Sequence, residues 1–163
     1  MRSLLLLGAF LVLATVFAAP VTLAQSGVRS GPDPAAIRDP ELEKDSLHNL
    51  NVARNYFKLK KAYVASLNRT QEILAGNPNF SKIDEALFIA GKSSLSLAEN
   101  KGKQSPSMYV SYDGTTRRKL TAEQFREMGR EYLTQLINDH PDSTFRKQAE
   151  EELRAIGGPT PKP

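Results

Sequence analysis

Residues 73–90 read ILAGNPNFSKIDEALFIA, and residues 136–153 read LINDHPDSTFRKQAEEEL. In each stretch an apolar helical pattern ends at a proline turn and a second apolar pattern begins. The stretches match at an offset of 63 residues, which pairs Pro78 with Pro141. The same offset aligns Ile73-Leu74 with Leu136-Ile137, Ala86 with Ala149, and Ala90 with Leu153. This self-similarity predicts a repeated helix–turn–helix unit and therefore an all-α fold.

Apolar residues at helical spacing extend on both sides of these turns and predict five helices within residues 39–156. Capping residues support the expected ends. Capping boxes begin at Ser81 and Thr121, Ser143 caps the last helix, and Gly76 and Gly157 follow helix ends. The expected helices span about residues 39–59, 61–75, 81–100, 121–139 and 143–156.

Residues 103–120 break the helical pattern between the third and fourth helices. The run from Met108 to Tyr112 has β-forming character, and Asp113-Gly114 is a favoured two-residue hairpin turn. We expect a small inserted β-hairpin or an ordered loop. When an insertion of roughly 25 residues is subtracted from the 63-residue offset, the remaining repeat length is near that of known helix–turn–helix repeats.

The two ends of the chain differ in composition from the rest. Residues 1–24 combine Arg2, an apolar run from Leu4 to Phe17 and small residues before Gln25, which predicts a secretory signal peptide. A retained membrane anchor is the alternative. Glycine and proline predict a flexible leader over residues 25–38 and a disordered tail over residues 157–163. We therefore expect an exported periplasmic protein, or an inner-membrane-anchored one if the leader is not cleaved.

Composition excludes several classes of function. The 163-residue chain has no cysteine, so it has no disulfide, thiolate metal site, cysteine nucleophile or lipid-modified N-terminal cysteine. Its 22 Lys and Arg against 18 Asp and Glu give a net charge of +4. Without a concentrated basic patch, this excess does not indicate nucleic-acid binding. We expect no cofactor, no bound metal, no nucleic acid and no lipid anchor.

The first predicted helix pair has the spacing of a tetratricopeptide repeat. Ala53 is followed three residues later by Tyr56 and twelve residues later by Ala65, and Pro78 closes the unit. Small residues let two helices approach closely while the aromatic ring fills the space beside them. In the second unit, Gly129 and Pro141 are the corresponding structural positions. The sequence thus predicts a tetratricopeptide-like stack of about five antiparallel helices.

One part of the chain resembles a specific family. The motifs are Val52-Ala53-Arg54-Asn55-Tyr56-Phe57, Ala62-Tyr63-Val64-Ala65-Ser66-Leu67-Asn68-Arg69, Asn77-Pro78 and Glu85-Ala86-Leu87. They are similar to the late tetratricopeptide repeats of the BamD family, outer-membrane lipoproteins of the β-barrel assembly machinery. The resemblance covers about residues 47–98. It implies a protein–protein interaction module in outer-membrane protein assembly, peripheral to the outer membrane. The family's lipidated cysteine and full set of repeats are missing, and the 103–120 insertion is foreign to its pattern.

Two groups of residues are candidates for partner binding. Arg54 and Lys58 belong to a basic cluster at the end of the first helix, which either docks an acidic partner or is a solvated helix end. Arg69 matches a family position, or pairs with Glu72 or Glu85 inside the repeat. In the insertion, Tyr109, Tyr112, Arg117 and Arg118 mix aromatic and basic side chains as interfaces do, or belong to a loop.

The sequence does not indicate catalysis. His48 and His140 are far apart, and Asp139 beside His140 is read as a helix stop rather than a catalytic dyad. We therefore expect a non-enzymatic module that binds a protein through the concave face or an end of the stack. Because so few repeats leave an apolar end uncovered, self-association is a further expectation. A general scaffold of the cell envelope is the alternative to a BamD-like role in barrel assembly.

Overall fold

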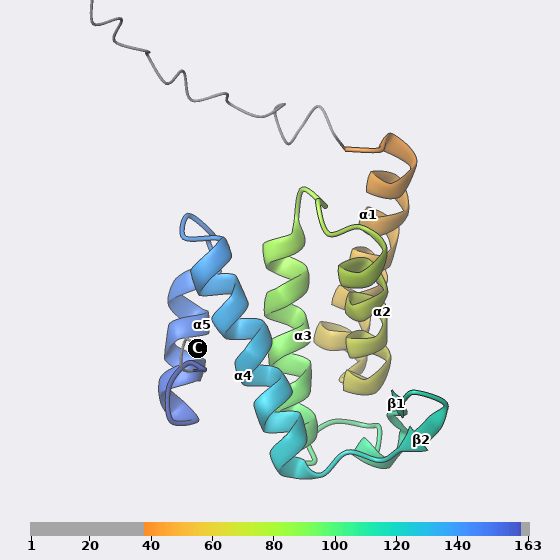
Figure 1. Ribbon diagram of the computed structural model, residues 1–163, viewed down its shortest axis with the longest axis vertical. Coiled ribbons are helices and arrows are strands. Elements are labelled where there is room, and N and C mark those ends of the chain that lie inside the picture. Colours follow the sequence, from red (N-terminus) through yellow and green to blue (C-terminus); the bar gives the residue numbers. More distant parts are fainter. Residues whose placement is uncertain (1–37, 161–163) are drawn as a thin grey trace, which may run out of the picture. The chain divides into compact units, whose positions relative to one another are not determined.

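The computed structural model describes residues 38–160. The predicted signal peptide (1–24), the predicted leader except for Arg38, and residues 161–163 of the predicted tail lie outside the described residues. Within residues 38–160 the chain forms five α-helices, a π-helical turn, a short 3-10 helix and one two-stranded sheet (Figure 1). The elements are α1 (Pro40–Asn55), η2 (Tyr56–Lys60), α2 (Tyr63–Gly76), α3 (Ile83–Ala98), η3 (Pro106–Met108), β1 (Ser111–Asp113), β2 (Thr116–Arg118), α4 (Ala122–Asp139) and α5 (Arg146–Ala155).

The helices stack in chain order. Each α-helix packs mainly against the next one along the chain, from α1 on α2 to α4 on α5, and neighbours run antiparallel (Figure 1). The predicted helical stack with a small hairpin between the third and fourth helices is therefore what forms. Three clusters of buried apolar side chains fill the contacts between successive helices. The largest fully buried apolar side chains include Leu50, Leu67, Phe80, Leu87, Phe125, Leu133 and Leu153.

The repeated proline turn predicted from the sequence is confirmed by its hydrogen bonds. In the turn between α2 and α3, backbone N–H groups donate from Asn77 to Ile73, Phe80 to Asn77, Ile83 to Phe80 and Ala86 to Lys82. In the turn between α4 and α5, the same four bonds run from His140 to Leu136, Ser143 to His140, Arg146 to Ser143 and Ala149 to Phe145. Every pair is displaced by 63 residues, so the repeat exists in the backbone as well as in the sequence.

Two glycines lie at the contact between α3 and α4. A Cβ atom on Gly91 would lie 2.6 Å from Cγ of Leu133, and one on Gly129 would lie 2.8 Å from Cδ2 of Leu95. Each leucine thus covers the glycine of the opposite helix. Gly129, predicted as a small structural position, occupies this contact.

Two predicted helix ends are confirmed. Thr121 accepts a hydrogen bond from the Gln124 amide while the Gln124 side chain accepts one from the Thr121 amide, so the capping box of α4 is formed. Gly157 has a φ of +97° after α5, and the Gly158 amide donates to the Leu153 carbonyl at 2.7 Å. This is the hydrogen-bond pattern of a glycine-terminated helix.

Three other predicted ends are wrong. Gly76 is the last residue of α2 and not a left-handed glycine beyond it, because Asn77 closes the helix. Ser81 does not cap α3, which begins after Lys82 without a side-chain cap. Ser143 lies in the turn, where its Oγ accepts from the Phe145 amide at 3.1 Å, and Phe145 is the N-cap of α5.

The connections on either side of α2 and α3 also differ from expectation. The first helix is regular to Asn55 and continues as η2, and the chain reverses at Lys61 with a φ of +52°. In the hairpin, Ser111 pairs with Arg118 and Asp113 with Thr116, so the two-residue turn is Gly114-Thr115 and not Asp113-Gly114. Met108 belongs to η3 and not to a strand.

The last helix covers the stack with a polar outer side. Among residues 38–160, the large hydrophobic side chains that are well exposed lie on α1 and around the α1–α2 and α3–α4 connections, and none lies on α5. The expected apolar end is therefore not found at α5. Beyond this helix the described part of the tail returns to α4, where the Thr160 amide donates to Oγ1 of Thr134 at 3.0 Å.

Candidate protein-binding groove

A groove of about 570 Å³ lies where η2, α3 and α5 meet. Because every second helix of the stack faces the same side, residues far apart in the sequence line it together. Phe57 lies in η2 and Phe88 in α3, and Phe145 is the residue that precedes α5. The remaining lining residues are Lys58, Glu85, Ile89, Lys92, Gln148, Glu151 and Glu152.

Aromatic rings form the apolar part of the groove. The rings of Phe88 and Phe145 stack with centroids 5.0 Å apart and an interplanar angle of 23°. Phe57 lies against Tyr63 at 5.5 Å between centroids. All three phenylalanines are half-buried, so they are held by the core and still present apolar area in the groove. Large rigid aromatic side chains in this state are typical anchors for a protein partner.

Ion pairs brace the groove. Arg54 contacts Glu85 through two guanidinium nitrogens, each 2.5 Å from a carboxylate oxygen, which links α1 to α3. Glu85 thereby raises the pKa of Arg54, which remains charged at every accessible pH. Lys92 and Glu152 form a second ion pair that links α3 to α5. The charged side chains along the groove have both signs, so the groove is amphipathic and not strongly charged.

The basic residues predicted to bind a partner have different surroundings. Arg54 is committed to Glu85 and to Asn51, so it is mainly a brace between helices. Lys58 is exposed and lines the groove. Arg69 pairs with Glu72 at 2.5 Å on the surface of α2, which is one of the two partners expected for it.

The residues predicted in the insertion are divided between core and surface. Tyr109 is 6% exposed and packs edge-on against Phe125 at 5.4 Å between ring centroids. The Gln71 side-chain amide donates to the hydroxyl groups of Tyr109 and Tyr132 at 2.9 and 3.0 Å. Tyr109 is therefore an anchor of the α3–α4 connection and not a surface residue. Tyr112, Arg117 and Arg118 lie exposed on the hairpin.

The predicted structural positions mostly lie at helix contacts. Ala53 is fully buried, and its carbonyl accepts a hydrogen bond from the Ser66 hydroxyl at 3.1 Å. Ala65 is half-buried and its amide donates to the Gln104 side chain at 2.9 Å. Tyr56 begins η2 and lies 5.0 Å from the Lys60 ammonium. Pro78 and Pro141 occupy equivalent places in the two repeated turns.

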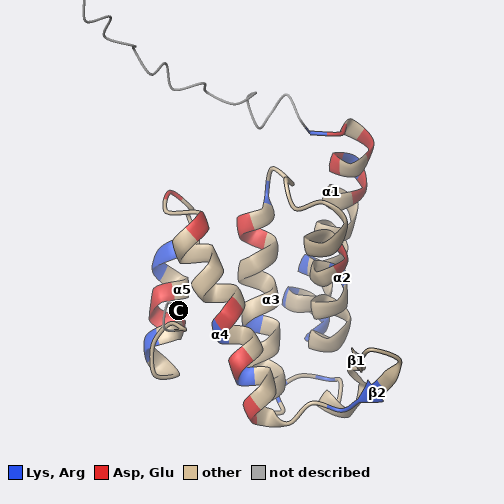
Figure 2. Cartoon of the chain, viewed as in Figure 1, with Lys and Arg blue, Asp and Glu red and all other residues tan. Residues whose placement is uncertain are grey.

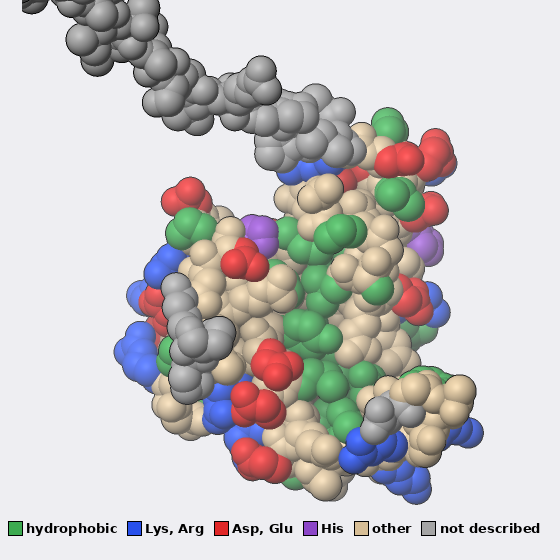
Figure 3. All heavy atoms as spheres, in the orientation of Figure 1, with side chains coloured by type: hydrophobic (Ala, Val, Ile, Leu, Met, Phe, Trp, Pro, Cys, Tyr) green, Lys and Arg blue, Asp and Glu red, His purple; other side chains and the backbone are tan. Residues whose placement is uncertain are grey.

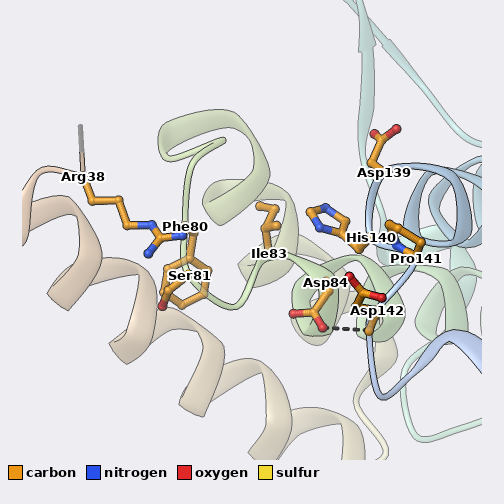
Figure 4. Close-up of a pocket in the computed structure, with 10 residues that line it drawn as sticks. Arg38, Phe80, Ser81, Ile83, Asp84, Asp139, His140, Pro141 and Asp142 are labelled. Atoms are coloured by element: carbon orange, nitrogen blue, oxygen red, sulfur yellow. Dashed lines mark hydrogen bonds between the residues drawn. The ribbon is translucent and has the colours of Figure 1, made fainter. Parts of the chain in front are cut away.

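A second cavity of about 350 Å³ lies between these two turns (Figure 4). Ser143 donates to Asp84 at 2.7 Å and so joins one turn to the other. Figure 4 shows the carboxylate of Asp139, the last residue of α4, pointing away from His140. Within residues 38–160, no group of three His, Asp or Glu side chains is placed to hold a metal ion. This cavity offers the weaker candidate site.

Comparison with protein-family models, curated proteins and solved structures finds no match to this chain. The helices between residues 38 and 160 include none with the length and apolar character needed to cross a membrane.

Phe88 and its contact with Phe145 are not predicted from the sequence. Neither phenylalanine is among the residues that the sequence predicts to bind a partner. The run Leu87-Phe88-Ile89-Ala90 makes α3 apolar over most of its circumference, which indicates a helix buried on more than one side. That signal points to Phe88 as a contact residue, although it does not identify the ring that it contacts.

Proposed function

We propose that this chain is a non-enzymatic protein-binding module that holds a segment of a partner protein in the groove between η2, α3 and α5. The observation that carries the proposal is the set of three half-buried phenylalanines, Phe57, Phe88 and Phe145, on the side shared by alternate helices. Preformed helices present these rings without a folding step in the binding event, which lowers the entropic cost of association.

The groove favours an amphipathic partner segment. Its floor takes apolar side chains, while Lys58 and Glu151 on its edges are exposed and of opposite charge. A helix or extended segment with an apolar side chain between polar ones has the matching chemistry. Most of the binding energy would then come from a few apolar contacts, with the charges fixing orientation.

The finer part of the proposal is a tetratricopeptide-like, BamD-like module in the periplasm that takes part in outer-membrane β-barrel assembly. Alternate helices sharing a groove, and the residues between 47 and 98 that resemble that family, support this proposal. The missing lipidated cysteine and the inserted hairpin favour the alternative, a general scaffold of the cell envelope unrelated to barrel assembly.

Site-specific crosslinking in the native cell tests the proposal. A photoreactive phenylalanine analogue replaces Gln148, an exposed residue that lines the groove, and in a matched control replaces Gln135, an exposed residue of α4. We expect a discrete protein adduct from position 148 and none from position 135. Mass spectrometry of the adduct separates barrel-assembly components from other envelope proteins.

The outcome that contradicts the groove is equally specific. If position 148 gives no adduct, or gives the same adducts as position 135, the groove is not the binding surface. If the crosslinked protein is not a barrel-assembly component, the groove is still the binding surface, and the result supports the general scaffold.

A further inference from the structure

Charge is divided between the two ends of the helical stack. We define the basic end as residues 56–63 and 98–121, which contain eight Lys and Arg against two Asp and Glu, a net charge of +6. The opposite end, residues 38–45, 76–85 and 138–146, contains eight Asp and Glu against four Lys and Arg, a net charge of −4. Figure 2 shows basic residues on the hairpin and acidic residues at the opposite ends of α1 and α3 and in the turn after α4.

Specific contacts join the two segments of the basic end. The Lys103 amide donates to the Lys61 carbonyl at 2.9 Å. Gly102 has a φ of +93°, and a Cβ atom there would lie 2.5 Å from the same carbonyl, so only glycine fits this crossing. The Gln104 side chain is bound by the Ala65 amide. The lysines that follow α1 are therefore held beside those of the α3–α4 connection.

The same end also carries the most exposed large hydrophobic side chains of the described chain. Among the large hydrophobic residues of the described chain, Leu59, Tyr112 and Met108 are the most exposed, at 76%, 66% and 57%. Leu59 lies between Lys58 and Lys60 in the sequence. Tyr112 pairs with Arg117 across the hairpin, and directly opposed residues share one face of a two-stranded sheet.

We infer that the basic end binds the surface of an anionic lipid bilayer. Lys and Arg side chains are attracted by the negative potential of anionic headgroups, and exposed Leu, Met and Tyr side chains enter the boundary between headgroups and acyl chains. A nucleic-acid backbone would use the cations but would leave Leu59 and Met108 in water. Figure 3 shows one group of lysine and arginine side chains around the hairpin, and others over α4 and α5 beside acidic residues. This surface shares only Phe57 and Lys58 with the groove, and none of the side chains substituted below lines the groove, so the inference does not depend on the proposed function.

The absence of tryptophan from the chain allows a site-specific test. The full-length variants Leu59→Trp and Tyr112→Trp each carry a single tryptophan at the basic end. Leu47→Trp is the matched control, because Leu47 is an exposed residue of α1 outside that end. Each variant is titrated with vesicles of phosphatidylcholine alone and with vesicles that also contain phosphatidylglycerol. Because all variants keep the same N-terminal segment, only the basic end can make their responses differ.

We expect a blue shift of emission and quenching by brominated lipid for Leu59→Trp and Tyr112→Trp with the phosphatidylglycerol vesicles only. Leu47→Trp should show neither effect. If all three respond alike, or if the first two respond equally to both kinds of vesicle, the inference is overturned. A response to soluble polyglutamate or single-stranded DNA without a response to vesicles also overturns it, in favour of an acidic macromolecule.

A charge series provides an independent readout. Lys103→Gln, Arg117→Gln and Lys119→Gln together remove three exposed cations of the basic end, and vesicle binding should fall about a hundredfold, since each cation near the surface contributes about a fivefold change. The control combines Lys44→Gln, Lys82→Gln and Lys147→Gln, which are exposed elsewhere and lower the net charge equally. Equal losses in the two triple variants would show that net charge alone acts and would contradict a localised binding surface.

Discussion

Gly91 and Gly129 are the residues on which the α3–α4 contact depends. Each lacks the side chain that would collide with a leucine of the opposite helix, and each backbone carbonyl lies within 3.3 Å of where the other glycine would carry a Cβ. Since protein interiors are close-packed, an added methyl group must displace a helix or a leucine rotamer. The close approach of α3 and α4 therefore depends on the absence of a side chain at these two positions.

Alanine at either glycine should therefore lower stability. We expect Gly91→Ala and Gly129→Ala each to reduce the free energy of unfolding by about 1–3 kcal/mol, measured by urea denaturation. Gly76→Ala is the control, because nothing lies within 4 Å of its added Cβ and its φ is not positive. That variant should gain roughly 0.5–1 kcal/mol. Equal effects at positions 76 and 91 would show that backbone propensity, and not close packing, determines the result.

Tyr132 makes stability depend on pH above the neutral range. Burial raises the pKa of Tyr132 above its ordinary value of 10.0. Between pH 10.0 and the raised folded-state pKa, the unfolded chain loses this proton while the folded chain keeps it. The contribution of the Tyr132 proton to the free energy of unfolding is therefore complete below pH 10.0. It is lost as the pH rises through the folded-state pKa of Tyr132.

The variant Tyr132→Phe should remove this dependence. We expect its free energy of unfolding to fall less steeply above pH 10.0 than that of the unmodified chain. At neutral pH it should be lower by about 1 kcal/mol, because the hydrogen bond from Gln71 is lost. Tyr112→Phe, at an exposed position, should leave the free energy of unfolding at neutral pH unchanged. Parallel pH profiles for Tyr132→Phe and the unmodified chain would contradict the account.

At the scale of helices and turns, local sequence rules succeed where the signal lies within a few neighbouring residues. Thr121 with Gln124 predicts its capping box correctly, and the proline turns at Pro78 and Pro141 predict the repeated hydrogen bonds. The rules fail at Ser81, where Phe80 is almost fully buried and the chain turns once more before α3 begins. Tertiary burial there overrides a local capping pattern.

A pair of alanine variants measures this difference between helix ends. Thr121→Ala should lower the free energy of unfolding by about 1 kcal/mol, since it removes a side-chain cap. Ser81→Ala should be close to neutral, because Ser81 is exposed and α3 has no side-chain cap. Thermal and urea unfolding of both variants provide the measurement. A larger loss at position 81 than at position 121 would mean that the capping box predicted for α3 forms after all.

The α3–α4 connection shows a limit of sequence-based prediction at the same scale. The hairpin is expected from its β-forming residues, but its turn is displaced by one residue to Gly114-Thr115. Tyr109 is expected on a binding surface and is instead buried against Phe125 and Gln71. A tyrosine has an apolar ring and a polar hydroxyl, so it suits both a buried site and a binding surface. The sequence alone does not distinguish the two, because the outcome depends on which helices pack against the residue.

At the scale of the whole molecule, the arrangement of the stack creates surfaces that no single element contains. The groove is formed by Phe57, Phe88 and Phe145 from three different elements. The basic end is formed by two segments that come together at Lys61 and Gly102, both of which have positive φ. The repeat and the helix count follow from periodicity. The meeting of particular side chains depends on how far each helix turns relative to the next, which periodicity does not specify.

The most direct test of the groove is the affinity for the partner segment that crosslinking at position 148 identifies. Isothermal titration compares the unmodified chain with Phe88→Ala and with the control Leu47→Ala, after circular dichroism confirms that each is folded under the assay conditions. We predict that Phe88→Ala raises Kd by roughly 30-fold, corresponding to about 2 kcal/mol for a central aromatic anchor, and that Leu47→Ala leaves Kd unchanged. An unchanged Kd for folded Phe88→Ala would contradict the groove as the binding site.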